Sequence, residues 1–224
     1  MTDSTPLNST YYTGFKKRSD VHLARKIWHM AGVFCLFLVW ALFSYEMSIL
    51  IFSVLWLMFV PGDILRLQNK NVNQTLTRLF KPIMRESELH RLAGTSYLLT
   101  GTILLALIFE PHVVSLSLLF LSFADPIASF VGIKYGKDKL FNNKSLQGFM
   151  AAFVVCFVVT SIYLYIVNTE KYLLVLSLCA GLIGAVSELI PVWKLDDNLT
   201  MPLFSSFGLT LLFTFFNVFG IAAI

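Results

Sequence analysis

Residues 113–133 read VVSLSLLFLSFADPIASFVGI, an apolar run in which Asp125 is the single charged residue. The length of the run matches the roughly 20 residues that an α-helix needs to cross the hydrocarbon core of a bilayer. Backbone groups in lipid find no water to bond, and a helix satisfies them within the segment itself. The run therefore predicts a transmembrane helix that carries a carboxylate at or within the membrane.

The composition of the whole chain indicates the same environment. Of its 224 residues, 57% are hydrophobic and 13% are charged, which is more apolar surface than a soluble domain of this size can bury. The net charge of +4 arises from basic residues in short segments between apolar runs, where such residues set membrane orientation. The sequence therefore predicts an integral membrane protein and no nucleic-acid partner.

Further apolar runs lie on both sides of this segment. They span residues 27–43, 47–60, 92–109, 148–167, 172–190 and 199–224. The first two are shorter than a typical crossing, and the others have about the required length. We therefore expect an all-α fold, a polytopic membrane helix bundle of about seven transmembrane helices in one domain over residues 27–224. Residues 1–26 are expected to form a polar, disordered tail.

The charges of the connecting segments predict the orientation. If the N-terminus lies in the cytoplasm, all but one of the 17 Lys and Arg residues are cytoplasmic, and Lys171 is the exception. The longest connecting segment, residues 61–91, then forms a cytoplasmic loop. Its apolar residues recur at helical spacing among basic ones, which favours a helix in the headgroup region, with a solvated connector as the alternative. We expect the membrane that contains the protein to be a bacterial inner membrane or the endoplasmic reticulum.

Asp125 is the first candidate functional residue. An ionised carboxylate within a membrane helix costs about 3 kcal/mol on insertion scales, so a metal ion, a basic partner or a proton must compensate for it. Pro126 lacks a backbone N–H, which predicts a helix opened toward the cytoplasm at this point. The alternative is a salt bridge that only packs two helices together.

A stretch rich in glycine and lysine follows Asp125. Glycines allow close backbone approach, and exposed amides together with ammonium groups suit a polyphosphate. The alternative explanation is the basic character expected of any cytoplasmic loop. The candidate phosphate-binding residues are Gly132, Lys134, Gly136, Lys144, Ser145 and Gly148.

Two more clusters lie near predicted helix ends. One comprises Glu188 and the adjacent Asp196, Asp197 and Asn198, whose side chains offer hard oxygen ligands that suit Mg2+ held jointly with substrate phosphates. Asp197 or Asn198 is alternatively a helix N-cap. In Arg25-Lys26-x-x-His29 the basic groups suit phosphate and His29 can exchange a proton, whereas positive-inside flanking is the ordinary explanation.

Taken in order, these clusters resemble the integral-membrane, CTP-dependent lipid kinases, which include dolichol kinase, phytol kinase and the yeast-type diacylglycerol kinase. The resemblance extends over about residues 22–205, and two positions depart from it: Ala124, where the family often has Gly, and Gln147, where it often has Glu. The matching segments are Arg25-Lys26-x-x-His29, Asp63-Ile64-Leu65-Arg66, Arg85-Glu86-x-Glu88-x-x-Arg91-x-x-Gly94, Asp125-x-x-Ala128-x-x-x-Gly132-x-x-x-Gly136, Lys144-Ser145-x-x-Gly148, and Glu188 with Asp197-Asn198-x-x-x-Pro202.

The resemblance implies a membrane enzyme that transfers the γ-phosphoryl group of CTP to the hydroxyl of a lipid alcohol, which is a polyprenol, phytol or diacylglycerol. It implies Mg2+ or another divalent cation, and an active face in the cytoplasm. The implied catalytic residues are Asp125, His29 and Lys144. The implied nucleotide-binding residues are Arg25, Lys26, Gly132, Lys134, Gly136, Lys144, Ser145, Gly148 and Asn198. The implied metal ligands are Asp125, Glu188 and Asp197.

Two other functions remain as alternatives. A phosphatidate cytidylyltransferase would use the same nucleotide and metal, but the expected HGG-x-x-DR stretch is absent from the sequence. A transporter would use Asp125 and Glu188 as an ion or proton relay, but such carboxylates should be distributed across the membrane rather than near one face.

Overall fold

The computed structural model describes residues 23–140, 144–190 and 195–220, and within these ranges the chain forms helices and no extended strand. The first 22 residues of the predicted polar tail lie outside the described residues. The helices are α1 (Leu23–Leu42), α2 (Tyr45–Gln68), α3 (Lys70–Leu79), the 3-10 helix η2 (Glu86–Leu89), α4 (Gly94–Ile108), α5 (Pro111–Tyr135), α6 (Leu146–Ile166), α7 (Leu173–Leu189) and α8 (Asp197–Phe215).

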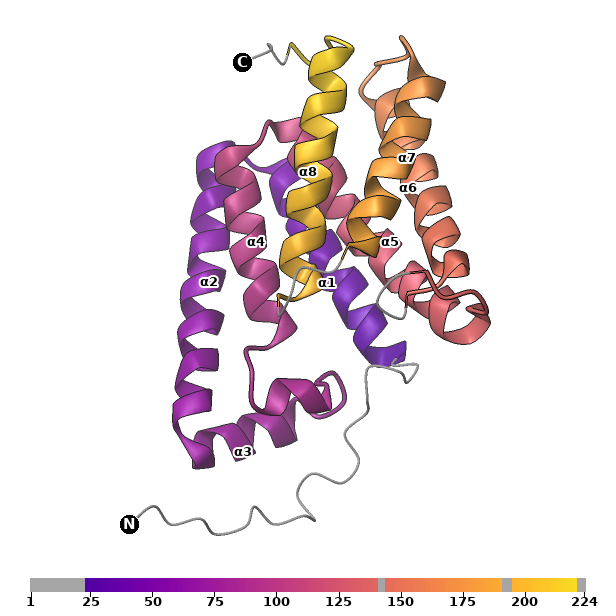
Figure 1. Cartoon of the computed structure of the whole chain (residues 1–224). Coiled ribbons are helices and arrows are strands. Elements are labelled where there is room, and N and C mark those ends of the chain that lie inside the picture. Colours follow the sequence, from indigo (N-terminus) through magenta and orange to yellow (C-terminus); the bar gives the residue numbers. More distant parts are fainter. Residues whose placement is uncertain (1–22, 141–143, 191–194, 221–224) are drawn as a thin grey trace.

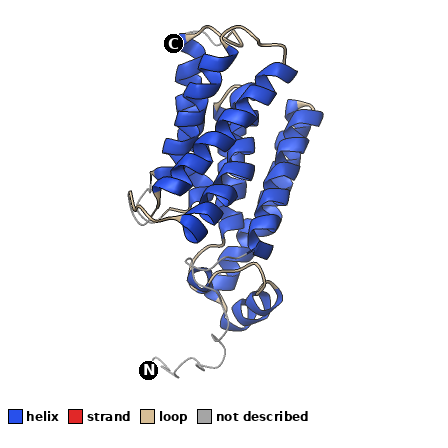
Figure 2. Ribbon diagram, turned by 90° about the vertical axis from the view of Figure 1, so that its right-hand side faces the viewer, coloured by secondary structure: helices blue, strands red, loops and turns tan. Residues whose placement is uncertain are grey.

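Each predicted apolar run coincides with one helix, which confirms the all-α membrane bundle. Five helices, namely α1, α2, α5, α6 and α8, are long and apolar enough to cross a membrane, and α4 and α7 are shorter apolar helices. Consecutive apolar helices, α4 and α7 included, run in opposite directions, and Figure 2 shows them side by side in a second view. As a result, α3 and the starts of α1, α6 and α8 lie at one end of the bundle (Figure 1).

We call this end the basic end, because the described Lys and Arg residues lie in the segments that meet there, apart from Lys171 between α6 and α7. The grouping agrees with the charge asymmetry of the sequence. The assignment of the basic end to the cytoplasm stays a prediction.

The boundaries of the first two helices differ from those predicted. α1 begins at Leu23, because Arg25 and Lys26 make contacts inside the protein and belong to its first turns. α2 passes through Pro61 and ends at Gln68, so the predicted loop starts later than residue 61. Asp63 and Arg66 hold this last part of the helix, since their side chains pair at 2.7 Å.

The connection between α2 and α4 contains α3 and η2. α3 bears out the expected helix, but it ends at Leu79, ahead of Pro82, because proline disfavours a helical conformation in the residue before it. Arg66 fixes the connection to the bundle. Its buried guanidinium donates to the side chain of Asn73 at 3.0 Å and to the carbonyls of Glu88 and Arg91 at 2.9 and 2.8 Å.

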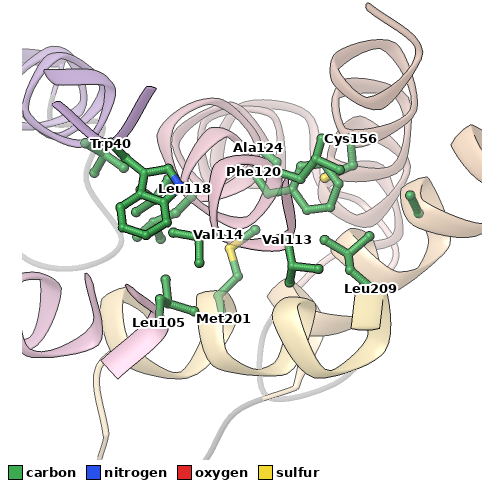
Figure 3. Close-up of a cluster of buried hydrophobic side chains, with 14 of the residues drawn as sticks. Trp40, Leu105, Val113, Val114, Leu118, Phe120, Ala124, Cys156, Met201 and Leu209 are labelled. Carbon is green, nitrogen blue, oxygen red and sulfur yellow. The ribbon is translucent and has the colours of Figure 1, made fainter. Parts of the chain in front are cut away.

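The core is centred on α5, which packs against α1, α6 and α8. Most of the α5 residues between Val113 and Ala128 are buried. Because the helices that cover α5 expose apolar side chains on their outer faces, the bundle has the inside and outside expected of a protein in lipid. Figure 3 shows side chains that meet in this core: Val113, Val114, Phe120 and Ala124 of α5, Trp40 of α1, Cys156 of α6, and Met201 and Leu209 of α8.

Candidate active site

Asp125 lies in α5 near the basic end, and the helix continues past it to Tyr135. The predicted opening of the helix at Pro126 is therefore wrong. A proline within a membrane helix is tolerated where neighbouring helices supply partners for nearby backbone groups, and α1 does so here. His29 Nε2 lies 3.1 Å from the carbonyl oxygen of Leu121, and Lys26 Nζ lies 3.3 Å from that of Pro126.

The same two α1 side chains face polar side chains of α5. His29 Nε2 lies 3.8 Å from Asp125 Oδ2. Lys26, one helical turn earlier, donates a 2.7 Å hydrogen bond to Ser129 Oγ, and Ser129 lies one turn beyond Asp125. Two basic groups of α1 thus face two polar groups of α5 in register.

Lys144, just before α6, contacts the end of α7 and the start of α8. Its ammonium group lies 2.9 Å from Glu188 Oε1 at the end of α7 and 3.6 Å from Asp197 Oδ2 at the start of α8, and it also donates to the carbonyl oxygen of Glu188. Burial alone would lower the pKa of Lys144, but the charges of Asp197 and Glu188 outweigh burial and raise the pKa above its ordinary value. Lys144 is therefore a partly buried, charged ammonium group.

Asp125 lies between the basic side chains of α1 and the group formed by Lys144, Glu188 and Asp197. Its charge acts on Lys26 and His29 of α1, and also on Lys144 and Glu188. The structure therefore brings together, at the basic end, residues that the sequence places in separate motifs. The arrangement alternates cations and carboxylates, which suits the binding of a polyphosphate and its counter-ion.

Arg25, which was expected to bind nucleotide, has an internal partner. Its guanidinium forms a bidentate pair with Glu88 of η2 at 2.7 and 2.9 Å, and it donates to the carbonyl oxygen of Ile83 at 2.7 Å. Glu88 also accepts the backbone N–H groups of Arg85 and Gly94. Burial favours the neutral form of Glu88, but Arg25 and these N–H groups lower the pKa of the carboxyl below its ordinary value.

Gly94, at the start of α4, lies where α1, η2 and α8 meet. Asn198, another predicted nucleotide ligand, donates from Nδ2 to the Gly94 carbonyl at 2.9 Å. A Cβ atom on Gly94 would lie 2.7 Å from that nitrogen and 3.0 Å from the Arg25 guanidinium, so a larger residue here would have to displace these side chains. We call these four residues, Arg25, Glu88, Gly94 and Asn198, the Gly94 junction.

The cap of α8 differs from the predicted alternatives by one residue. Asp196, rather than Asp197 or Asn198, is the N-cap, and its Oδ1 accepts the backbone N–H of Asn198 at 3.0 Å. Burial raises the pKa of Asp196, and the hydrogen bond from Asn198 opposes this rise. The cap leaves the carboxylate of Asp197 to face Lys144.

In the glycine-rich stretch after Asp125, Gly132 lies in the last turns of α5 and Gly136 caps the helix. The glycines let the end of α5 approach the start of α6. A Cβ atom on Gly136 would lie 2.6 Å from Ser145 Oγ, and one on Gly148 would lie 2.9 Å from the carbonyl oxygen of Ala128. Ser145 Oγ in turn accepts the N–H of Gly148 and caps α6. Phosphate binding by these residues stays a prediction.

Lys134 extends along the outside of α5. Its ammonium group lies 5.5 and 5.2 Å from the ring centroids of Phe130 and Tyr135, within the range of a cation–π contact. The structure places Lys134 over these rings, and its predicted role in nucleotide binding is untested.

Within the described ranges, no group of three or more His, Cys, Asp or Glu side chains is arranged to hold a metal ion without further ligands. Two of the three predicted metal ligands, Glu188 and Asp197, instead share the ammonium group of Lys144. Their carboxylate oxygens are the hard donors that Mg2+ prefers, and Mg2+ is commonly bound by one or two carboxylates together with substrate phosphates. The carboxylates of Glu188 and Asp197 therefore suit a divalent cation that binds together with a nucleotide.

Sequence reasoning gave no site role to Ser129 or Glu88, and it did not predict Asp196 as the N-cap of α8. The spacing from Asp125 places Ser129 on the same helix face, and this signal could have found it. Glu88 lies 63 positions from its partner Arg25, and no local pattern reveals such a pair. Asp196 was passed over because an adjacent Asp and Asn are equally good capping residues.

Several known proteins resemble this chain in amino-acid sequence. No protein-family model matches the chain, and no solved structure matches it. It is 34% identical over 170 residues to CTP-dependent diacylglycerol kinase 1 of Schizosaccharomyces pombe, an alignment covering 70% of this chain and 78% of that protein. It is 31% identical over 211 residues to CTP-dependent diacylglycerol kinase 1 of Saccharomyces cerevisiae, covering 82% and 71%.

An uncharacterized protein of Rickettsia prowazekii is 29% identical over 189 residues, covering 82% of this chain and 91% of that protein. The two yeast alignments extend over most of both chains. The chain therefore belongs to the family of CTP-dependent membrane lipid kinases.

Proposed function

We propose that this protein transfers the γ-phosphoryl group of CTP to the hydroxyl of diacylglycerol, yielding CDP and phosphatidate. The names of its yeast relatives support both the nucleotide and the acceptor. The observation that carries the proposal is the Lys144 contact with Glu188 and Asp197, beside Asp125 and His29, at the basic end of an otherwise apolar bundle. Polyprenols and phytol are the competing acceptors.

Lys144 and Lys26 are suited to binding the phosphates. Both ammonium groups are fixed by hydrogen bonds and partly buried, so they are oriented before the nucleotide arrives. Positioned cations of this kind stabilise the charge that develops on the phosphoryl oxygens as the group is transferred.

Asp125 is suited to orienting the acceptor. The lipid hydroxyl oxygen forms a bond to the γ-phosphorus, the bond from that phosphorus to the β–γ bridging oxygen breaks, and CDP leaves with the electron pair. Asp125 accepts the hydroxyl proton, and His29, 3.8 Å away, stabilises the carboxylate and can receive the proton in turn. Glu188 and Asp197 would hold a divalent cation, which neutralises phosphate charge when bound.

The test uses purified protein in lipid nanodiscs with CTP labelled at the γ-phosphate. Diacylglycerol, a polyprenol and phytol are supplied separately, and products are separated by chromatography. We expect label in phosphatidate, with unlabelled CDP as the second product. Labelled polyprenyl or phytyl phosphate would reassign the acceptor. Labelled pyrophosphate together with a CDP-lipid formed from added phosphatidate would instead identify a cytidylyltransferase.

A further inference from the structure

Ser129 is a polar residue of the site that has no assigned role. It lies one helical turn beyond Asp125 on α5, and its Oγ accepts a 2.7 Å hydrogen bond from Lys26 Nζ. The same ammonium group is 3.3 Å from the carbonyl oxygen of Pro126. Hydrogen bonds from a charged donor are stronger than those between neutral groups, so these contacts fix the end of a long side chain.

The position of Ser129 determines where the charge of Lys26 lies. On α1, Lys26 and His29 are one turn apart, and on α5, Ser129 and Asp125 are one turn apart. His29 faces Asp125, whereas Lys26 is bound to Ser129. The ammonium group is therefore close enough to Asp125 to interact with its charge, but its short contacts are with other groups.

We propose that Ser129 is a positioning residue for phosphoryl transfer, which holds Lys26 away from direct pairing with Asp125. An ammonium group has three N–H donors, and the contacts with Ser129 and Pro126 use two of them. The third remains for a phosphate oxygen, and Asp125 remains available to the acceptor hydroxyl. This inference rests on the proposed function, since it assigns Lys26 to the phosphates of CTP.

Loss of the Ser129 hydroxyl has a defined consequence. Opposite charges attract strongly in the low dielectric of a protein interior. Without its hydrogen-bond acceptor, the flexible Lys26 side chain turns to Asp125 and forms a direct ion pair. That pair occupies the phosphate-binding cation and the carboxylate together, so CTP must break it in order to bind.

The test measures equilibrium binding of radiolabelled CTP to the purified protein in nanodiscs, without an acceptor lipid. Ser129→Ala should raise the Kd for CTP about 10- to 100-fold, the range expected for losing one hydrogen bond to a charged group. Ser129→Thr retains the hydroxyl and should bind nearly as tightly as the native protein. Lys26→Ala should weaken binding at least as much as Ser129→Ala.

The decisive variant is the double substitution of Ser129 and Lys26 by alanine. If Ser129 acts through Lys26, the double variant should have the same Kd as Lys26→Ala alone. Ser161→Ala is the matched control, because Ser161 is a membrane-helix serine whose hydroxyl donates to the Phe157 carbonyl in α6. Its Kd should equal that of the native protein.

Three results would overturn the inference while leaving the kinase assignment in place. They are a native Kd in Ser129→Ala, a defect in Ser129→Thr as large as that of Ser129→Ala, and additive effects in the double variant. Failure of the native protein to bind CTP at all would instead overturn the proposed function together with this inference.

Discussion

At the scale of single residues, Asp125 is the most informative side chain. Asp125→Asn keeps the size of the side chain but removes its charge and its ability to accept a proton. Because an unneutralised charge destabilises a buried site, we expect the variant to fold and insert normally. Turnover should fall by at least about 100-fold, the usual contribution of a general base. Phosphorylation assays and size-exclusion profiles of the purified variant test this, and near-native activity would contradict the assignment.

Lys144→Ala tests whether the ammonium group of Lys144 binds the phosphates of CTP. A cation that contacts the phosphates more strongly in the transition state affects both kinetic terms, so the KM for CTP should rise and kcat should fall, with little change in the KM for the lipid. Lys171→Ala is the control, because Lys171 lies at the opposite end of the bundle against the ring of Tyr172. Steady-state kinetics with each substrate varied separately measure both variants. Equal defects in the two would refute a phosphate-binding role.

Glu88 permits a prediction about stability. Glu88→Gln leaves the buried Arg25 guanidinium without its counter-charge, and removing one partner of such a pair typically destabilises a protein by about 3–5 kcal/mol. Thermal unfolding in detergent should therefore show a lower midpoint for Glu88→Gln at neutral pH. An unchanged midpoint would mean that the pair contributes nothing.

The pH dependence of this stability has a definite sign. The pKa of Glu88 is lower in the folded protein than its ordinary value of about 4.3, so the pair stabilises the fold fully above that value. The contribution is lost as the pH falls through the folded pKa. The native protein and Glu88→Gln should therefore converge in stability in acid, whereas a constant difference at all pH values would argue against the ion pair.

The sequence selected most of the residues that meet at the candidate site, but not how they pair. Asp125 was recognisable because a charged side chain inside an apolar run is rare and needs compensation. Lys144, Glu188 and Asp197 were selected as charged residues near predicted helix ends. The pairing of Lys144 with two carboxylates depends on three helix ends that meet only in the folded bundle. Long-range contacts of this kind have no local signature.

At the scale of secondary-structure elements, the sequence predicted the long helices well and their ends less well. Apolar length is a strong signal, because only a helix can satisfy backbone groups in lipid. The errors occur at Pro61 and Pro126, which lie within helices even though proline removes a helix hydrogen bond. Packing against neighbouring helices outweighs this local preference, and a single sequence does not reveal where it will do so.

The close approach of α5 and α6 gives a prediction at this scale. Gly148→Ala places a Cβ atom 2.9 Å from the Ala128 carbonyl, so the two helices must separate, and overpacking of this kind costs about 1–3 kcal/mol. Gly32→Ala is the matched control, because its Cβ atom would meet nothing within 4 Å. Thermal unfolding should show a lower midpoint for Gly148→Ala alone, and an equal change in both variants would contradict the packing.

At the scale of the whole molecule, the charge distribution predicts which end faces the cytoplasm. Lys139→Cys and Glu170→Cys place thiols at the basic end and at the opposite end, in a background from which the native Cys35, Cys156 and Cys179 have been removed. A membrane-impermeant thiol reagent applied from the cytoplasmic side should label only Lys139→Cys. Labelling of Lys139→Cys from the outside would reverse the topology and remove the site from cytosolic CTP.

The Gly94 junction has a consequence for synthesis of the enzyme. Arg25 is among the first membrane-embedded residues to leave the ribosome, whereas Asn198 and Asp197 belong to the last described helix. If the helices are inserted in order, Arg25 lacks its α8 neighbours until α8 has been inserted. A translation product that terminates before α8 therefore lacks Asp197 and Asn198 at the basic end. We expect such a fragment to bind CTP more weakly than a protein that contains α8.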